Sequence, residues 1–215
     1  MAVNHYRVAQ WGTGHSGTRS LKSVIEHPQM TLVALRVYNP EKVGKDAGTL
    51  CGLPDTGVIA TDKIQDVIAA KPDCLLYFPA IAMTNVDDMC AILEAGINIV
   101  TLIAEFYHAP SLDPDIRLRV ENACKKGNSS LYATGPNPGF ASGVLPLGAI
   151  SFQRRLDAVK LYEFADMSSR TADMNKDLWG WDPADLTKLH GMNAMILPFY
   201  GDALKQTAEL VGLPL

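Results

Sequence analysis

The chain has 215 residues, of which 47% are hydrophobic and 20% charged, and its formal net charge is -4. This composition is typical of a globular protein with a sizeable core, and the acidic balance argues against a general nucleic-acid-binding protein. We find neither an apolar stretch of about 18 residues nor a signal-peptide pattern, so we expect a cytoplasmic protein that does not associate with membranes. The four cysteines are widely spaced without a C-x-x-C pair, which favours buried free thiols over disulfides or a metal site.

Strand and helix patterns alternate along the first 135 residues. Apolar runs predict strands at 6–12, 31–38, 57–60, 73–78, 98–103 and 129–134. Helical spacing predicts helices near 16–26, 62–70, 84–95 and 113–126. Nearly continuous apolar strands such as 73–78 are typical of a parallel sheet that is covered on both faces. The sequence therefore predicts an α/β fold, a doubly wound parallel sheet of the Rossmann type.

The pattern changes after Gly135. A short apolar helix is predicted near 142–152, a half-buried strand of another sheet at 156–167, and mainly helix from about Asp182 onward. A single strand cannot satisfy its own hydrogen-bonding groups, so its partner strands belong to another subunit or to a part of the domain that this sequence lacks. We favour the second explanation. We thus predict a dinucleotide-binding Rossmann domain at 1–140 and the start of an incomplete α+β substrate-binding and dimerisation domain at 141–215.

A glycine-rich loop after the first predicted strand is the strongest functional signal. The apolar run 6–11 leads into a G-x-G-x-x-G pattern, and helical spacing follows it. In dinucleotide-binding folds these glycines permit a tight turn, close approach of a pyrophosphate, and close packing of helix on strand. The phosphates bind to free N–H groups at the helix N-terminus. We predict cofactor contacts throughout the loop, at Gly12, Thr13, Gly14, His15, Ser16 and Gly17; the alternative is a turn without a ligand.

The end of the second strand predicts how the cofactor's ribose is recognised. An acidic residue there favours NAD, but this stretch has Asn39 where the acid is expected, with Arg36 and Lys42 close by. We therefore favour NADP, with NAD possible; the alternative is that both basic residues are solvated surface charges. Because ligands bind outside the carboxyl ends of the strands, Tyr38 and Pro79 are further predicted contacts.

Glu105 is the predicted catalytic residue. It follows the apolar run 97–103, so it lies at the carboxyl end of a predicted strand. Its apolar and aromatic neighbours predict partial desolvation of the carboxylate, which suits proton transfer. The alternative is a surface carboxylate paired with a lysine, and we interpret the nearby His108 as structural or exposed.

A dense turn at 134–140 is predicted to reach the same site. Asn137 offers both a donor and an acceptor to an amide such as the nicotinamide carboxamide, and Pro138 adjoins it. An interdomain hinge is a compatible alternative. We predict that Phe140, Phe164 and Trp179 line an apolar substrate pocket, although core packing is a common role for isolated aromatic residues.

With these residues in place, the chain resembles the reductase-like family of 2,4-diaminopentanoate dehydrogenase and the native amine dehydrogenases, often described as dihydrodipicolinate reductase-like. The resemblance lies in the segments 10–17, 38–48, 104–106 and 135–140. It implies that Glu105 is the catalytic carboxylate. The His-His-x-x-Lys-x-Asp-x-Pro-Ser-Gly-Thr segment of dihydrodipicolinate reductases is absent, so we discount that activity. Family members run considerably longer, in agreement with an incomplete second domain.

The sequence thus predicts an NAD(P)-dependent amine dehydrogenase. Such an enzyme converts an amine to a ketone or aldehyde with release of ammonia, and catalyses the reverse reductive amination. We expect a homodimer. Two alternatives remain, another NADP-dependent reductase of a carbonyl or cyclic imine, and a non-enzymatic NADP-binding protein.

Overall fold

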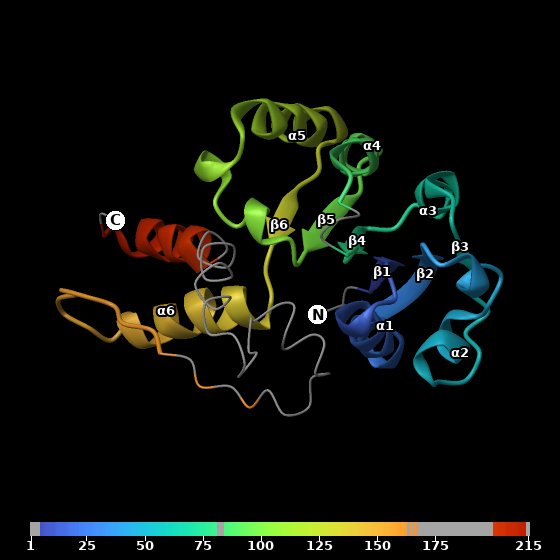
Figure 1. Cartoon of the computed structure of the whole chain (residues 1–215), viewed down its shortest axis with the longest axis horizontal. Coiled ribbons are helices and arrows are strands. Elements are labelled where there is room, and N and C mark those ends of the chain that lie inside the picture. The colour runs from blue at the N-terminus through green and yellow to red at the C-terminus, as the bar shows by residue number, and fades with distance from the viewer. Residues whose placement is uncertain (1–4, 81–83, 163, 165, 167–199, 214–215) are drawn as a thin grey trace, which may run out of the picture. The chain divides into compact units, whose positions relative to one another are not determined.

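The computed structural model describes residues 5–80, 84–162, 164, 166 and 200–213 (Figure 1). It divides into two compact units, Met1–Ala133 and Thr134–Leu215. Each unit is described by itself. In the described part of the chain, no helix is long and apolar enough to cross a membrane.

The first unit is built on one parallel sheet. Its strands are β1 (Tyr6–Trp11), β2 (Met30–Arg36), β3 (Ala60–Thr61), β4 (Cys74–Tyr77), β5 (Asn98–Thr101) and β6 (Leu131–Ala133). The strand order is β3-β2-β1-β4-β5-β6, and every neighbouring pair is parallel. This is the Rossmann order, in which the direction of winding reverses between β1 and β4. The predicted fold class is therefore confirmed.

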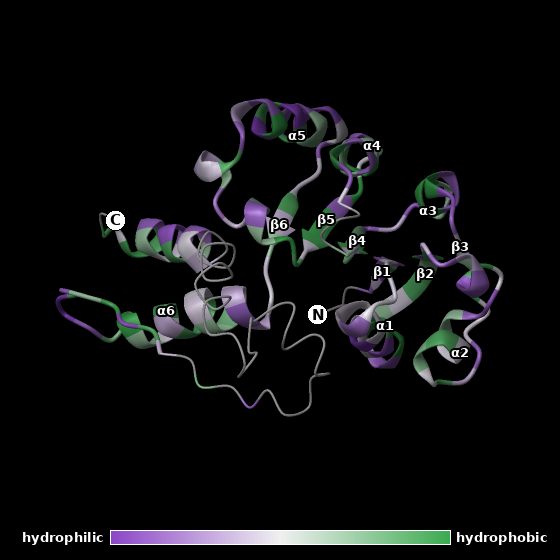
Figure 2. Cartoon of the chain, in the orientation of Figure 1, coloured by the Kyte–Doolittle hydropathy of each residue, from purple (hydrophilic) through white to green (hydrophobic). Residues whose placement is uncertain are grey.

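Two apolar cores lie on opposite faces of this sheet. One contains α1 (His15–Glu26) and α2 (Ala47–Cys51), and the other contains α3 (Ile64–Ala69), α4 (Val86–Glu94) and α5 (Pro114–Gly127). Figure 2 shows hydrophobic and hydrophilic residues alternating along α5, as expected of a helix with one buried face. Side chains alternate between faces along each strand, so Val8 packs into the first core whereas Ala9 packs into the second.

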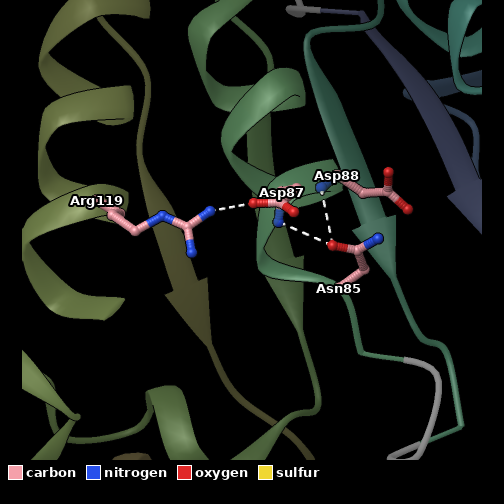
Figure 3. A network of polar contacts seen from close by, with 4 residues as sticks. All are labelled: Asn85, Asp87, Asp88 and Arg119. Atoms are coloured by element: carbon pink, nitrogen blue, oxygen red, sulfur yellow. Dashed lines mark hydrogen bonds and ion pairs between the residues drawn. The ribbon is translucent and has the colours of Figure 1, made fainter. Parts of the chain in front are cut away.

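Three details differ from the sequence prediction. Helix α2 and the 3-10 turn η1 (Pro40–Lys42) were not predicted. Helix α4 is capped by Asn85, whose side chain accepts hydrogen bonds from the backbone N–H groups of Asp87 and Asp88 (Figure 3). The predicted strand at 57–60 is found as the shorter β3, because Gly57 adopts a φ of 79° that breaks an extended run.

The second unit is only partly described. An irregular turn, η5 (Pro136–Val144), leads into α6 (Leu145–Ile150), which lies within the predicted helix 142–152. Residues 200–211 are helical, and the rest of the predicted helical region lies outside the described residues. The predicted strand at 156–167 is wrong for its described residues, which form no strand. The physical reason is that no described strand lies beside them to complete a ladder.

Candidate functional site

Two glycines of the loop between β1 and α1 are required by the fold itself. Gly12 has a φ of 95°, and a Cβ there would lie 3.0 Å from the carbonyl carbon of Phe78 and closer still to its oxygen. A Cβ at Gly17 would lie 2.8 Å from the carbonyl carbon of Gly12. The loop is therefore packed tightly against both the end of β4 and the first turn of α1. Pro79, a predicted contact, directly follows Phe78 and so adjoins the loop.

Gly14 differs from these two glycines because no backbone angle or contact of the described residues requires a glycine there. Its φ is -73°, open to any residue, and a Cβ there would meet no atom within 4 Å. Gly14 is also the N-cap of α1, where no side chain caps the helix and no acidic residue occupies the first turn. The first N–H groups of this 12-residue helix thus receive no side-chain cap among the described residues. This arrangement fits an anionic phosphate that approaches the backbone closely.

Gln10 supports the loop from below and was given no role by the sequence analysis. It is fully buried, its Nε2 donates to the carbonyl oxygen of Gly12 at 3.2 Å, and its Oε1 accepts from Ser20 Oγ at 3.1 Å. These bonds join the strand, the loop and helix α1. The sequence does carry a signal for this role, because Gln10 is a polar residue within an apolar strand, two positions before the first glycine.

The turn after β2 is joined to the glycine-rich loop by a lysine. Lys42 Nζ donates to the carbonyl oxygen and to Oγ1 of Thr13, each at 3.0 Å. Asn39 Oδ1 accepts from the backbone N–H of Glu41 at 2.9 Å and so caps the turn η1. The structure therefore brings the predicted residues Thr13, Asn39 and Lys42 to the same edge of the sheet.

Arg36 is half-buried and stacks on two aromatic rings, in contrast to the alternative of a solvated surface charge. Its guanidinium carbon lies 4.2 Å from the centroid of the Trp11 ring and 4.1 Å from that of Tyr38. The reason is strand register: Arg36 is the Cα partner of Trp11, and their side chains lie on the same face of the sheet. Tyr38 in turn accepts a hydrogen bond from Trp11 Nε1 at 2.9 Å.

Glu105 lies in η3 (Ala104–Phe106), directly after β5. Thr101 sets this position, because its buried hydroxyl donates to the carbonyl oxygen of Tyr77 at 2.8 Å and accepts from the N–H of Ile103 at 3.2 Å. Glu105 is exposed, which corrects the predicted desolvation. In the tight turn its apolar neighbours Ile103 and Phe106 enter the core, and the glutamate is left facing outward.

Two tyrosines near this edge keep their protons at neutral pH. Burial raises the pKa of Tyr107 to about 12, and burial also raises the pKa of Tyr77. His108 Nδ1 lies 2.7 Å from Ser111 Oγ, which agrees with a structural role. Glu105 is thus an accessible carboxylate at the carboxyl end of β5, on the sheet edge where the glycine-rich loop also lies.

The predicted residues of the second unit are less well defined. Asn137 and Pro138 lie in η5, where Gly139 has a φ of 124° and its N–H donates to Ser142 Oγ at 2.9 Å. Phe140 is 54% and Phe164 95% exposed, and Trp179 lies outside the described residues. A cavity of about 330 Å³ in this unit includes neither phenylalanine; its lining residues are Asp157, Ala158, Val159, Leu204, Thr207, Ala208, Val211 and Leu213.

The cysteines are structural in character. All four are unpaired and half-buried, and burial raises the pKa of Cys74 to about 11. Over the described residues, no group of three or more His, Cys, Asp or Glu side chains is placed to hold a metal ion.

Comparisons with known proteins find two enzymes of similar sequence. An amine dehydrogenase from Streptomyces virginiae is 30% identical over 214 residues, 95% of this chain. The chain resembles the amine dehydrogenases. It spans 59% of the length of that relative. A 4-hydroxy-tetrahydrodipicolinate reductase from Mastigocladus laminosus is 35% identical over 63 residues, 29% of this chain and 23% of that protein. These findings confirm the resemblance inferred from the sequence, although no protein-family model matches the chain.

Solved structures confirm the fold. The amine dehydrogenase from Mycobacterium smegmatis has a TM-score of 0.62 and 21% identity, covering 71% of this chain and 45% of that chain. GenD2 from gentamicin A biosynthesis, in complex with NAD, has a TM-score of 0.52 and 16% identity. The match covers 72% of this chain and 41% of the GenD2 chain. At these identities the likeness concerns architecture.

Proposed function

We propose that this chain forms the cofactor-binding part of an NAD(P)-dependent amine dehydrogenase and carries its catalytic carboxylate. The observation that carries the proposal is the open N-terminus of α1 at Gly14, a glycine that the fold itself does not require. The similarity to an amine dehydrogenase over 95% of the chain supplies the reaction class. Small amines, their ketone or aldehyde products and ammonia are then the substrates, and the protein acts as a homodimer in the cytoplasm.

The loop Gly12–Gly17 holds the cofactor pyrophosphate in this proposal, with Pro79 beside it. Tyr38 and Asn39 contact the adenosine ribose. Asn137 and Pro138 contact the nicotinamide end, and Phe140, Phe164 and Trp179 surround the substrate.

We further propose that NADP is preferred over NAD, with Lys42 as the reason. Arg36 is stacked against two rings, and of these two basic residues it is Lys42 that bonds to the loop. An ammonium group has three donors, and two of them bond to Thr13, which leaves one for a 2′-phosphate oxygen.

Glu105 serves as the base. In the oxidative direction it accepts a proton from the substrate ammonium, which makes the amine nitrogen neutral. Bound NAD(P)⁺ supplies the hydride acceptor for the amine carbon, and the substrate becomes an iminium. Glu105 releases the ammonium proton to solvent and then takes a proton from a water that adds to the iminium carbon. It returns that proton to the nitrogen of the resulting carbinolamine and accepts the hydroxyl proton as the C–N bond breaks, so that ammonia and the carbonyl product leave. Its exposed position admits that water. Reductive amination runs these steps in reverse.

A reductase acting on a cyclic imine is the second candidate, favoured by the 63-residue match to a 4-hydroxy-tetrahydrodipicolinate reductase. Ammonia separates the two activities, because only reductive amination consumes it. NADPH oxidation is therefore measured with small ketones and aldehydes, with and without ammonium. Oxidation that needs no ammonium favours the reductase. Nucleotide binding without turnover favours a non-enzymatic protein.

The role of Glu105 is tested by Glu105→Gln. Loss of a general base lowers the rate by about 10²–10⁴-fold, whereas the affinity for the cofactor stays unchanged. Glu105→Asp recovers little, because the carboxylate moves by one methylene. The matched control is Glu121→Gln on α5, a glutamate that pairs with Arg117. Near-normal turnover in Glu105→Gln would contradict the catalytic role.

A further inference from the structure

Three side chains at the ends of β1 and β2 form a stack beneath the candidate cofactor site. We call Trp11, Arg36 and Tyr38 the Arg36 stack. The guanidinium carbon of Arg36 lies 4.2 Å and 4.1 Å from the two ring centroids, and Trp11 Nε1 donates to Tyr38 Oη at 2.9 Å. Each member therefore contacts the other two. Trp11 immediately precedes Gly12, and Tyr38 immediately precedes Asn39.

The guanidinium is held by the rings rather than by hydrogen bonds at Nε and Nη1. Both atoms are buried and have no hydrogen-bond partner among the described residues. Buried donors without partners destabilise a fold, so this arrangement is costly. A lysine cannot fully replace Arg36, because the planar guanidinium stacks on aromatic faces and an ammonium group does not.

The charge of Arg36 also acts on Asp88 of helix α4. Burial raises the pKa of Asp88, and the positive charge of Arg36 opposes that rise. The preceding Asp87 instead forms an ion pair with Arg119 of α5. Figure 3 shows the two carboxylates pointing in different directions, with Asp88 turned away from Arg119. Arg119 therefore pairs with Asp87, whereas the charge of Arg36 acts on Asp88.

Nε and Nη1 of Arg36 are buried, so neither atom is open to a cofactor. The influence of Arg36 passes instead through Tyr38. This residue leads into the turn in which Asn39 caps η1 and Lys42 reaches Thr13. A change in the position of Tyr38 displaces the start of that turn.

We propose that Arg36 is a positioning residue that holds Tyr38, and with it the turn from Asn39 to Lys42, in the geometry that binds the adenosine half of the cofactor. This inference rests on the proposed function. It implies that loss of the stack weakens recognition of the adenosine half and leaves recognition of the nicotinamide half intact.

The experiment compares two halves of the cofactor as separate ligands. Binding of 2′,5′-ADP and of nicotinamide mononucleotide is measured by calorimetry for the wild-type protein, Arg36→Met, Arg36→Lys and the matched control Arg119→Met. We expect Arg36→Met to bind 2′,5′-ADP about 3- to 30-fold more weakly, the range that corresponds to one cation–π interaction. We expect Arg36→Met to bind nicotinamide mononucleotide as the wild type does. The control Arg119→Met should bind both ligands with wild-type affinity.

Arg36→Lys distinguishes positioning from a general structural role. It retains the charge without the planar contact, so we expect a smaller loss for 2′,5′-ADP in the same direction, and this comparison remains available if Arg36→Met does not fold. Equal weakening of both ligands, or no weakening, overturns the proposal. A wild-type protein that binds neither ligand contradicts the proposed function instead.

Discussion

Neighbouring glycines of one motif serve different purposes, and substitution separates them. A valine at Gly14 fits the fold but fills the space that a phosphate would enter, so Gly14→Val keeps its unfolding free energy and loses cofactor affinity. Gly12→Ala forces a Cβ against the Phe78 carbonyl at a φ of 95° and destabilises the protein by about 1–3 kcal/mol. Denaturant unfolding and NADPH titration measure the two effects. Unchanged affinity in folded Gly14→Val contradicts the assignment of the loop.

Asp46 makes the stability of the first unit depend on pH. Its carboxylate accepts backbone hydrogen bonds from Thr56 at 2.9 Å, Gly48 at 2.7 Å and Gly57 at 2.8 Å. These bonds, that of Thr56 above all, lower the pKa of Asp46. A lowered folded-state pKa stabilises the protein above the unfolded-state value, and this contribution is lost as the pH falls through the folded-state value.

Thermal melts of the wild type and Asp46→Asn test this dependence. We expect the variant to melt at a lower temperature at pH 7, because an amide N–H₂ replaces one acceptor oxygen. The difference begins to narrow below about pH 4, the ordinary aspartate pKa, and narrows further as the pH falls through the lowered pKa of folded Asp46. A difference that stays constant down to pH 2 contradicts this assignment.

At the scale of elements, the sequence predicts the long helices and the six strands but misses the short turns. Periodicity reports which face of an element is buried, and α1 and α5 are long enough to show it. The turn η1 and helix α2 depend instead on single side chains, Asn39 and Asp46, which bond to backbone N–H groups. The environment of Arg36 depends on the register between β1 and β2, and that of Glu105 depends on the tight turn η3. The local pattern of apolar and polar residues specifies neither.

The N-terminus of α4 distinguishes two adjacent candidates for its cap. Asn85 accepts hydrogen bonds from the N–H groups of Asp87 and Asp88 (Figure 3). The Oγ1 of the preceding Thr84 is buried without a partner among the described residues. Asn85→Ala should lower the unfolding free energy by about 1 kcal/mol. Thr84→Ala should cost less, because it removes an unpaired hydroxyl. Urea unfolding compares the two variants, and a reversed order contradicts the assignment of the cap.

At the scale of the whole molecule, the first unit should unfold from its edges. Strands β1 and β4 each have a parallel neighbour on both sides and carry fully buried residues such as Trp11 and Leu75. Their amides should exchange most slowly in hydrogen–deuterium exchange, and those of the edge strands β3 and β6 faster. Uniform protection across the sheet contradicts this expectation.

The second unit shows where sequence patterns stop being informative. Residues 156–162 alternate as a strand does, yet they form no strand in the structure. Alternation specifies which face of a strand is apolar, but it does not supply the neighbouring backbone that completes a ladder. The Rossmann unit was predictable because all six of its strands lie within the sequence.

The two hydrogen bonds from Lys42 to Thr13 constrain any attempt to redesign nucleotide selectivity. Exchanging Lys42 for an acidic residue, the obvious change toward NAD, also removes the Lys42 donor from the carbonyl and hydroxyl oxygens of Thr13, and the carbonyl oxygen keeps its bond from Thr18 Oγ1. The charge at the ribose and the shape of the phosphate loop therefore cannot be altered independently. A double-mutant cycle on these two residues should show non-additive effects on nucleotide affinity, and productive variants should carry paired replacements at both positions.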